Sequence, residues 1–288
     1  MYKIAGRIFV AGILVSVIWS ILSLPFAGYT ETLFPLFFAL VACVLLKKPL
    51  RRTFWLSKPP ASLVTTLVGV GLVLVSFIMG VQFTADLVTK GALSRYLERF
   101  PSPPRPESAV LAVLILGFLL PGLEELFFRG FLLSAFSPEE FGPGGHIWLP
   151  VLIFTLLHPP VVMPSALIMS VFAAQAVTSS NSIVPAMVLH SVNNLVGQGF
   201  DYLYTVNKLV ALTSALTAMG LGVVIIYVQR RDFLRLCRMV SESWKDYTAR
   251  FRETGRKVSS EWSYVALALL IVLNIIAFFF YVQEAPGS

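Results

Sequence analysis

The chain has 288 residues, of which 57% are hydrophobic and 13% are charged, with a mean hydropathy of +0.80 and a net charge of +7. A typical soluble domain is roughly 25% charged. This composition excludes an ordinary water-soluble globular domain and indicates a protein that folds in lipid.

Apolar runs long enough for membrane-spanning helices recur along the chain. Such a helix needs about 20 apolar residues to cross a hydrocarbon core about 30 Å thick. The runs are continuous, whereas a membrane β-barrel would show segments of about ten residues that alternate apolar and polar. We therefore predict an all-α polytopic bundle of eight or nine membrane helices, forming one integral membrane domain over residues 1–288. The runs cover residues 8–28, 32–46, 62–85, 108–135, 147–177 with a break, 183–206, 208–229 and 263–282.

The first apolar run and the positions of the basic residues predict the membrane topology. Lys3 and Arg7 precede the first run, as in a signal peptide, but the run is longer than an ordinary signal-peptide core, which favours an uncleaved helix. Two basic clusters belong in the cytoplasm by the positive-inside rule. We expect a multi-pass protein of the cell membrane with a cytoplasmic amino terminus. The clusters are Lys47, Lys48, Arg51 and Arg52, and the nine Lys and Arg residues from Arg230 to Lys257.

The basic segment 230–262 has two interpretations. Its apolar residues recur at helical spacing, which is typical of an amphipathic helix on anionic headgroups. A solvated cytoplasmic linker before the last helix fits equally well. Nucleic acid is not an expected partner, because the positive charge lies where the membrane topology already requires it.

Glu124 and Glu125 stand together in an apolar run, with Arg129 four residues after Glu125. Ionisable groups inside a membrane are costly and usually mark a pathway or a reaction site. Residues four apart share a helix face, and neighbours are turned by about 100°. Glu125 and Arg129 should therefore form a structural ion pair, while Glu124 faces a cavity as a general acid or base. A clamp between helices without chemistry is the structural alternative.

Two histidines and an asparagine complete the candidate site. His158 closes the run IWLPVLIFTLLHPP and lies about mid-depth, about 11 residues at 1.5 Å each after Ile147. A histidine there can act as a base or as an interhelical hydrogen-bonding residue. His190 and Asn194 are four residues apart, so both can donate hydrogen bonds to one developing oxyanion.

The remaining polar residues and cysteines suggest no further site. Asn193 is turned away by about 100° and should be a packing residue or a helix contact. His146, in FGPGGHIW, should be a solvated or interfacial loop residue. Cys43 and Cys237 offer neither a disulfide framework nor a CxxC metal knuckle.

Three motifs, in order, resemble the CPBP family of intramembrane proteases, also called the ABI family, which includes the type II CAAX prenyl endopeptidases. The resemblance covers about residues 110–200, the expected catalytic core, while the flanking helices match only in hydrophobicity. The matching residues are Glu124, Glu125 and Arg129 for EExxxR, Phe154 and His158 for FxxxH, and His190 and Asn194 for HxxxN.

The resemblance implies a glutamic-type endopeptidase whose site lies in a cavity within the bilayer. Glu124 and His158 would activate a water that attacks a peptide carbonyl, and His190 and Asn194 would stabilise the oxyanion. The supporting residues would be Glu125 and Arg129, which hold the Glu124 helix, and Phe154, which packs beside His158.

The resemblance leaves cofactor and substrate open. Two histidines and a glutamate are a known catalytic zinc set, but the chain has no HExxH, so we expect no cofactor. The partners would be the bilayer and a membrane-anchored protein or peptide, cut near its terminus. The cut would remove three residues after a lipidated cysteine, a carboxy-terminal sorting tail or a leader peptide. Two other classes remain: a proton-coupled transporter with a Glu124–His158 relay, and a non-catalytic scaffold or immunity protein of the same fold.

Overall fold

The computed structural model describes residues 33–34, 36–37, 39–41, 43–44, 47, 49–90, 108–158 and 162–254. Over these residues the chain is helical, and its one isolated bridge joins Leu56 to Ser182. The prediction of an all-α fold is confirmed for this part of the chain. The predicted runs 8–28 and 263–282, and parts of 32–46, lie outside it, as do Pro159, Pro160 and residues 255–262.

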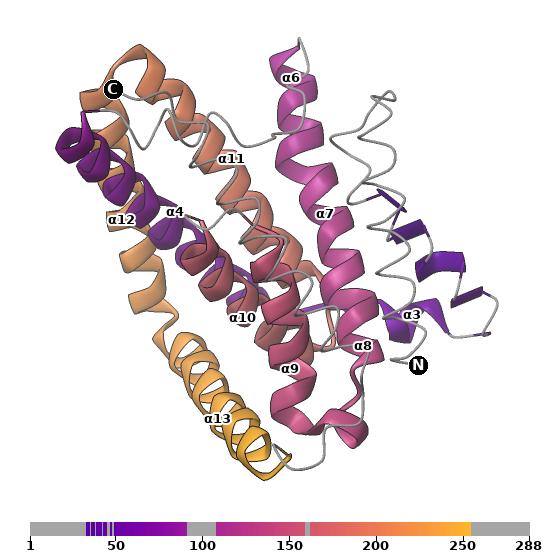
Figure 1. The fold of residues 1–288 in the computed structure, drawn as a ribbon. Helices are drawn as coiled ribbons and strands as arrows, with labels where there is room; N and C mark the ends of the chain where they lie inside the picture. Colours follow the sequence, from indigo (N-terminus) through magenta and orange to yellow (C-terminus); the bar gives the residue numbers. More distant parts are fainter. Residues whose placement is uncertain are drawn as a thin grey trace, which may run out of the picture.

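The helices follow the predicted apolar runs closely. One long helix, drawn in magenta in Figure 1, is made of five consecutive pieces and stands beside α11. The elements are α3 (Leu50–Thr53), α4 (Ala61–Thr89), the five pieces α6 (Ala109–Ala112), η1 (Val113–Leu119), α7 (Leu120–Glu125), η2 (Leu126–Leu132) and α8 (Leu133–Ala135), then α9 (Pro138–Leu156), α10 (Met163–Ser180), α11 (Val184–Val206), α12 (Lys208–Val228) and α13 (Arg230–Thr254).

Three helices of the described residues are long and apolar enough to cross a membrane, and they support an integral membrane protein. They are α4, the helix from Val110 to Ala135, and α12. A shorter apolar helix covers Phe141–Leu156. α10 and α11 form where apolar runs predict them, but polar residues such as His190 and Asn194 lower the hydropathy of α11. The total of eight or nine membrane helices stays a prediction.

The long helix departs from α-helical register on both sides of the two glutamates. η1 and η2 are π-helical, with hydrogen bonds from N–H to the carbonyl five residues earlier, such as Leu120 to Ile115 and Leu133 to Phe128. Pro121, the second residue of α7, has no backbone N–H to donate. π-Helical turns are rare and occur frequently at functional sites. Glu124 and Glu125 lie on α7, between the two π-helical pieces.

His146 does not lie in a solvated loop, and that prediction is wrong. α9 begins at Pro138 and contains a kink at Gly142, whose φ of 71° and ψ of 166° suit glycine alone. The helix resumes after the kink and includes His146. The imidazole is buried, and its Nδ1 donates to the carbonyl of Phe136 at 2.6 Å. Packing against neighbouring helices therefore overrides the local glycine and proline signals.

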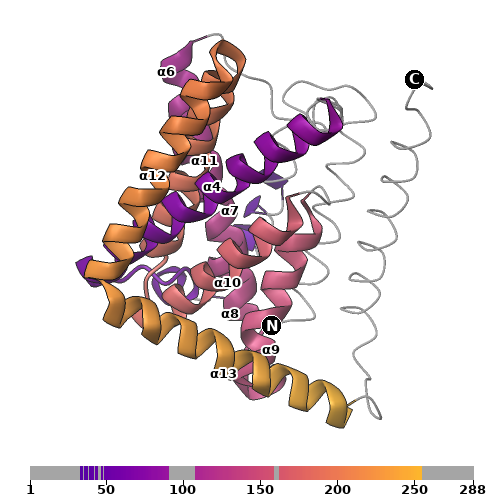
Figure 2. The same ribbon diagram turned by 90° about the vertical axis from the view of Figure 1, so that its left-hand side faces the viewer.

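The basic segment forms α13, which crosses the lower end of the bundle beneath α9 in Figure 2. Its apolar residues pack on α9 and α10, an arrangement that neither sequence interpretation anticipates. Gly144 permits the closest approach, because a Cβ there would lie 2.3 Å from the backbone nitrogen of Tyr247. The Gly144 N–H donates to Asp246 Oδ2 at 2.8 Å, and the Trp148 and Trp244 rings meet edge to face at 4.6 Å. α13 is thus a packed part of the bundle.

Candidate active site

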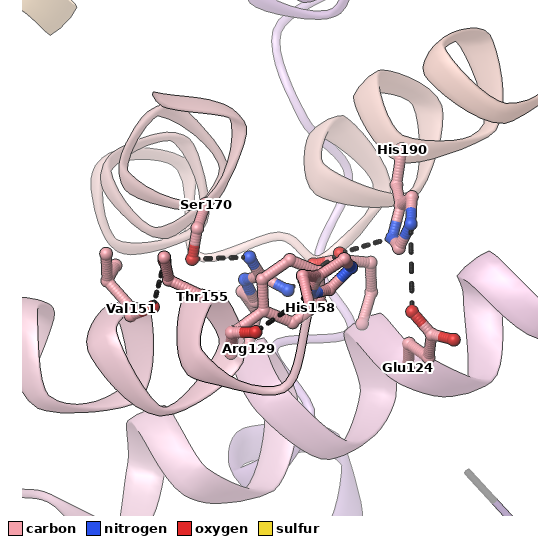
Figure 3. Close-up of polar contacts among 9 residues, drawn as sticks. Glu124, Arg129, Val151, Thr155, His158, Ser170 and His190 are labelled. Atoms are coloured by element: carbon pink, nitrogen blue, oxygen red, sulfur yellow. Dashed lines mark hydrogen bonds and ion pairs between the residues drawn. The ribbon is translucent and has the colours of Figure 1, made fainter. Parts of the chain in front are cut away.

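A buried ion pair holds the segment that carries the two glutamates. Arg129 Nη1 donates to Glu125 Oε1 at 2.8 Å, as the four-residue spacing predicts, and both side chains are almost fully buried. Arg129 Nη2 donates to Ser170 Oγ of α10 at 2.7 Å (Figure 3). Arg129 therefore joins η2 to α10 while it balances the charge of Glu125. Breaking such a pair would leave an uncompensated buried charge, which is strongly destabilising.

His190 of α11 contacts both glutamates. Its Nδ1 donates to Glu125 Oε1 at 2.8 Å. Its Nε2 lies 3.7 Å from Glu124 Oε2 (Figure 3). An ionised carboxylate only accepts hydrogen bonds, so the Nδ1 of His190 carries a proton. In the neutral ring, Nε2 therefore carries a lone pair and accepts hydrogen bonds. Nε2 donates a hydrogen bond only in the positively charged imidazolium form.

The two neighbouring glutamates differ in access. The side chain of Glu124 is 27% exposed, whereas that of Glu125 is 0% exposed. This difference follows from their separation of about 100° around the helix. The second oxygen of Glu125, Oε2, is buried and has no hydrogen-bond partner among the described residues. Glu124 is thus the carboxylate that an outside molecule can reach.

His158 lies just beyond the end of α9 and is half-buried. Its Nδ1 donates to the carbonyl of Phe154 at 2.9 Å, which leaves Nε2 as the acceptor of the neutral ring. α9 ends at Leu156, two residues before His158, which closes the apolar run. An imidazole fixed in this tautomer can accept a proton or a hydrogen bond from water.

Phe154 is the packing centre of the candidate site. Its ring lies 4.5 Å from that of His158 and 5.8 Å from that of His190, measured between centroids. The Arg129 guanidinium carbon lies 4.1 Å from the centroid of the same ring, within the range of a cation–π contact. Phe154 therefore contacts residues of all three sequence motifs. The resemblance had implied a contact with His158 alone.

Asn194 contacts the long helix at a different level from His190. Its Nδ2 donates to the backbone carbonyl of Leu116 in η1 at 3.3 Å. One N–H of the amide is therefore engaged in a contact between helices. Asn193, predicted to be a packing residue, has a buried Oδ1 without a hydrogen-bond partner in the described part of the chain.

Sequence reasoning did not single out two groups of this site, Ser170 and the Leu116 carbonyl. Ser170 is a buried hydroxyl in the apolar sequence ALIMSVFAA, and a lone polar residue in such a stretch is a signal for a buried partner. The role of the Leu116 carbonyl depends on backbone register, which residue types alone do not reveal.

The donor set gives no ready metal centre. Among the residues that the structure describes, no three His, Cys, Asp or Glu side chains group as a metal ion would require. Nδ1 of His158 and Nδ1 of His190 are both engaged as donors, so each ring could offer a metal only its Nε2.

Comparison with known families supports the resemblance found in the sequence. Residues 106–196 match the family model described as "Type II CAAX prenyl endopeptidase Rce1-like". The matched segment holds every candidate site residue, and the match confirms the resemblance to the CPBP proteases over that segment. Neither the curated proteins nor the solved structures contain a match to the chain.

Proposed function

We propose that this protein is an intramembrane endopeptidase of the glutamic type. The observation that carries the proposal is Glu124, a reachable carboxylate 3.7 Å from His190, within a segment that matches an endopeptidase family model. The buried Glu125–Arg129 ion pair also supports the proposal, because such a pair fixes the geometry of the helix that carries Glu124.

Glu124 and His158 activate the attacking water in this proposal. The water donates one hydrogen bond to His158 Nε2 and transfers a proton to the Glu124 carboxylate as its oxygen bonds to the peptide carbonyl carbon. Glu124 then gives that proton to the amide nitrogen, and the C–N bond breaks. The products are a carboxylic acid, which keeps the second proton of the water, and an amine; this proton then passes to the amine to give a carboxylate and an ammonium group. The enzyme forms no covalent bond to the substrate. General acid–base catalysis of this kind typically contributes about 10²–10⁴ in rate.

His190 and Asn194 stabilise the oxyanion of the tetrahedral intermediate. His190 donates from Nε2 when its ring is protonated, and the Glu125 carboxylate holds that ring in place through Nδ1. Asn194 donates through an amide N–H. Donors held in place before the reaction are the most effective, because they need no reorganisation when charge develops.

The supporting residues act through these four. Glu125 fixes the ring of His190, Arg129 fixes Glu125, and Phe154 packs against Arg129 and both histidines. The proposed reaction uses no cofactor, since a carboxylate and an imidazole supply the base; zinc is the alternative that chelation tests.

The proposed substrate is a membrane-anchored, lipid-modified protein or peptide cut near its carboxy terminus. The description of the matching family names a CAAX prenyl endopeptidase. In the described part of the chain, three helices long and apolar enough to cross a bilayer support access to a lipid-anchored chain from within the membrane. Location in the cell membrane, with a cytoplasmic amino terminus, completes the proposal.

The test uses the purified full chain in liposomes and a peptide that ends in a farnesylated cysteine and three further residues. Mass spectrometry should detect release of the last three residues, and the same peptide without the farnesyl group should be cut much more slowly. Absence of cleavage together with proton-coupled solute flux would contradict the proposal and favour a transporter. Absence of both would favour a scaffold.

A further inference from the structure

The backbone carbonyl of Leu116 has lost its donor within its own helix. In an α-helix it would accept from the N–H of Leu120, but that N–H bonds to Ile115 in the π-helical register of η1. In the π-helical register the donor would be residue 121, which is a proline and has no N–H. The register and Pro121 together leave this carbonyl without a partner in the helix.

The carbonyl lies in the helix from Val110 to Ala135, which is long and apolar enough to cross the membrane, and an unsatisfied backbone group there is costly. Asn194 of α11 supplies the missing donor through Nδ2, at 3.3 Å. An asparagine side chain thus replaces a backbone N–H, as polar side chains of neighbouring helices do beside membrane prolines.

The helices come very close beside this bond. A Cβ on Gly117 would lie 2.2 Å from Cδ2 and 2.8 Å from Cγ of Leu195, so the backbone of η1 approaches α11 at the residues next to Leu116 and Asn194. Further along, His190 meets Glu124 and Glu125. His190 thus lies beside Glu124, and Asn194, one turn later on α11, lies beside Leu116, which precedes Glu124 on the long helix. The long helix and α11 therefore run antiparallel.

We propose that Asn194 is a positioning residue: its bond to the Leu116 carbonyl fixes the axial position of the Glu124 helix against α11. This contact and the His190 contacts lie at two levels of one helix pair, so together they determine both the shift and the rotation that place Glu124 near His190. The bond also orients the amide of Asn194, so that its second N–H is the one that serves the reacting carbonyl. This last step rests on the proposed function; the positioning role does not.

A double-mutant cycle between Asn194 and Pro121 tests the bond without any assay of hydrolysis. Asn194→Leu removes the donor and should lower the thermal unfolding midpoint in detergent, followed by tryptophan fluorescence, by about 3–8 °C. Pro121→Ala restores a backbone N–H that can reach Leu116. In the Pro121→Ala background the same asparagine substitution should therefore lower the midpoint by less than half as much.

Asn193→Leu is the matched control, because it makes the same change one position away on α11. Its effect should be equal in both backgrounds. Additive effects of Asn194→Leu and Pro121→Ala would overturn the proposed positioning role, whether or not the protein cleaves a peptide.

If the proteins fold too poorly to compare, Gly117→Ala gives a second test, since pushing the helices apart should make a subsequent Asn194→Leu change harmless. An unchanged effect of Asn194→Leu in that background would also overturn the role.

Hydrolysis of the farnesylated peptide then separates the two roles of Asn194. Asn194→Leu should lower kcat, and Pro121→Ala should restore part of kcat but not all of it, since the oxyanion donor is still missing. An unchanged kcat in Asn194→Leu would exclude the asparagine from the reaction. The double-mutant cycle of unfolding midpoints would still test the hydrogen bond between Asn194 and the Leu116 carbonyl. A wild-type protein without hydrolysis would contradict the proposed function alone.

Discussion

Glu125 Oε1 is shared: the oxygen that pairs with Arg129 also accepts the Nδ1–H of His190, each at 2.8 Å. Glu125 thus orients the imidazole of His190, and the other nitrogen of that imidazole lies near Glu124. This relationship makes Glu125 a link between the ion pair of the long helix and the proposed reaction at Glu124.

Glu125→Gln should destabilise the protein by about 3–5 kcal/mol, because it leaves the buried Arg129 charge without its counter-ion. It should also impair hydrolysis, since His190 loses the carboxylate that orients it. Chemical unfolding in detergent measures the first effect. Glu242→Gln, at an exposed glutamate on α13, is the control and should unfold like the wild type. Equal stability of the two variants would contradict a structural ion pair.

Phe154→Leu should destabilise the fold by about 1–2 kcal/mol and lower hydrolysis as well, because the ring packs on Arg129, His158 and His190. The comparison is Phe172→Leu, whose ring stacks on Phe233 at 6.0 Å instead. That change should affect stability while sparing kcat. If both variants retain the wild-type kcat, Phe154 is an ordinary packing residue.

Gly144→Ala should weaken the packing of α13 on α9 by about 1–3 kcal/mol, since the new Cβ would meet the backbone of Tyr247 and Ser243, which cannot rotate away. Gly220→Ala in α12, where a Cβ would find nothing within 4 Å, is the matched control and should leave stability equal or slightly higher. The unfolding midpoint measures both. A neutral Gly144→Ala would mean that α13 does not pack closely against α9.

Prolonged dialysis against a strong zinc chelator should leave hydrolysis of the farnesylated peptide unchanged. The reason is that, in the proposed mechanism, a carboxylate and an imidazole provide the base without a metal ion. Activity that disappears on dialysis and returns with added zinc would replace this mechanism by a metal-dependent one.

The apolar runs and the spacing of charged residues predicted much of the described structure. Helix ends near Leu156 and Val206 follow from the runs, and the Glu125–Arg129 contact follows from helical geometry alone. These features depend on a few neighbouring residues. They are therefore readable from the sequence without knowledge of how the helices pack.

The features that the sequence could not predict depend on contacts between distant helices. The glycines and proline around His146 favour a loop locally, but burial beneath the surrounding helices keeps the residue in α9. Asn194 could be assigned to the site by its motif, but its partner could not, because the π-helical register decides which carbonyl needs a donor. Likewise, the face of α13 that packs on α9 was known to be apolar, but its partner was not.

The proposed role of Glu124 is tested most directly by the initial rate at which purified Glu124→Gln cleaves the farnesylated peptide, measured beside its unfolding midpoint. Glu124 is partly exposed, so the variant should fold like the wild type. Its rate should nevertheless fall by about 10²–10⁴, the usual contribution of a general base. A folded Glu124→Gln protein that cleaves at the wild-type rate would contradict glutamate-activated water as the basis of the reaction.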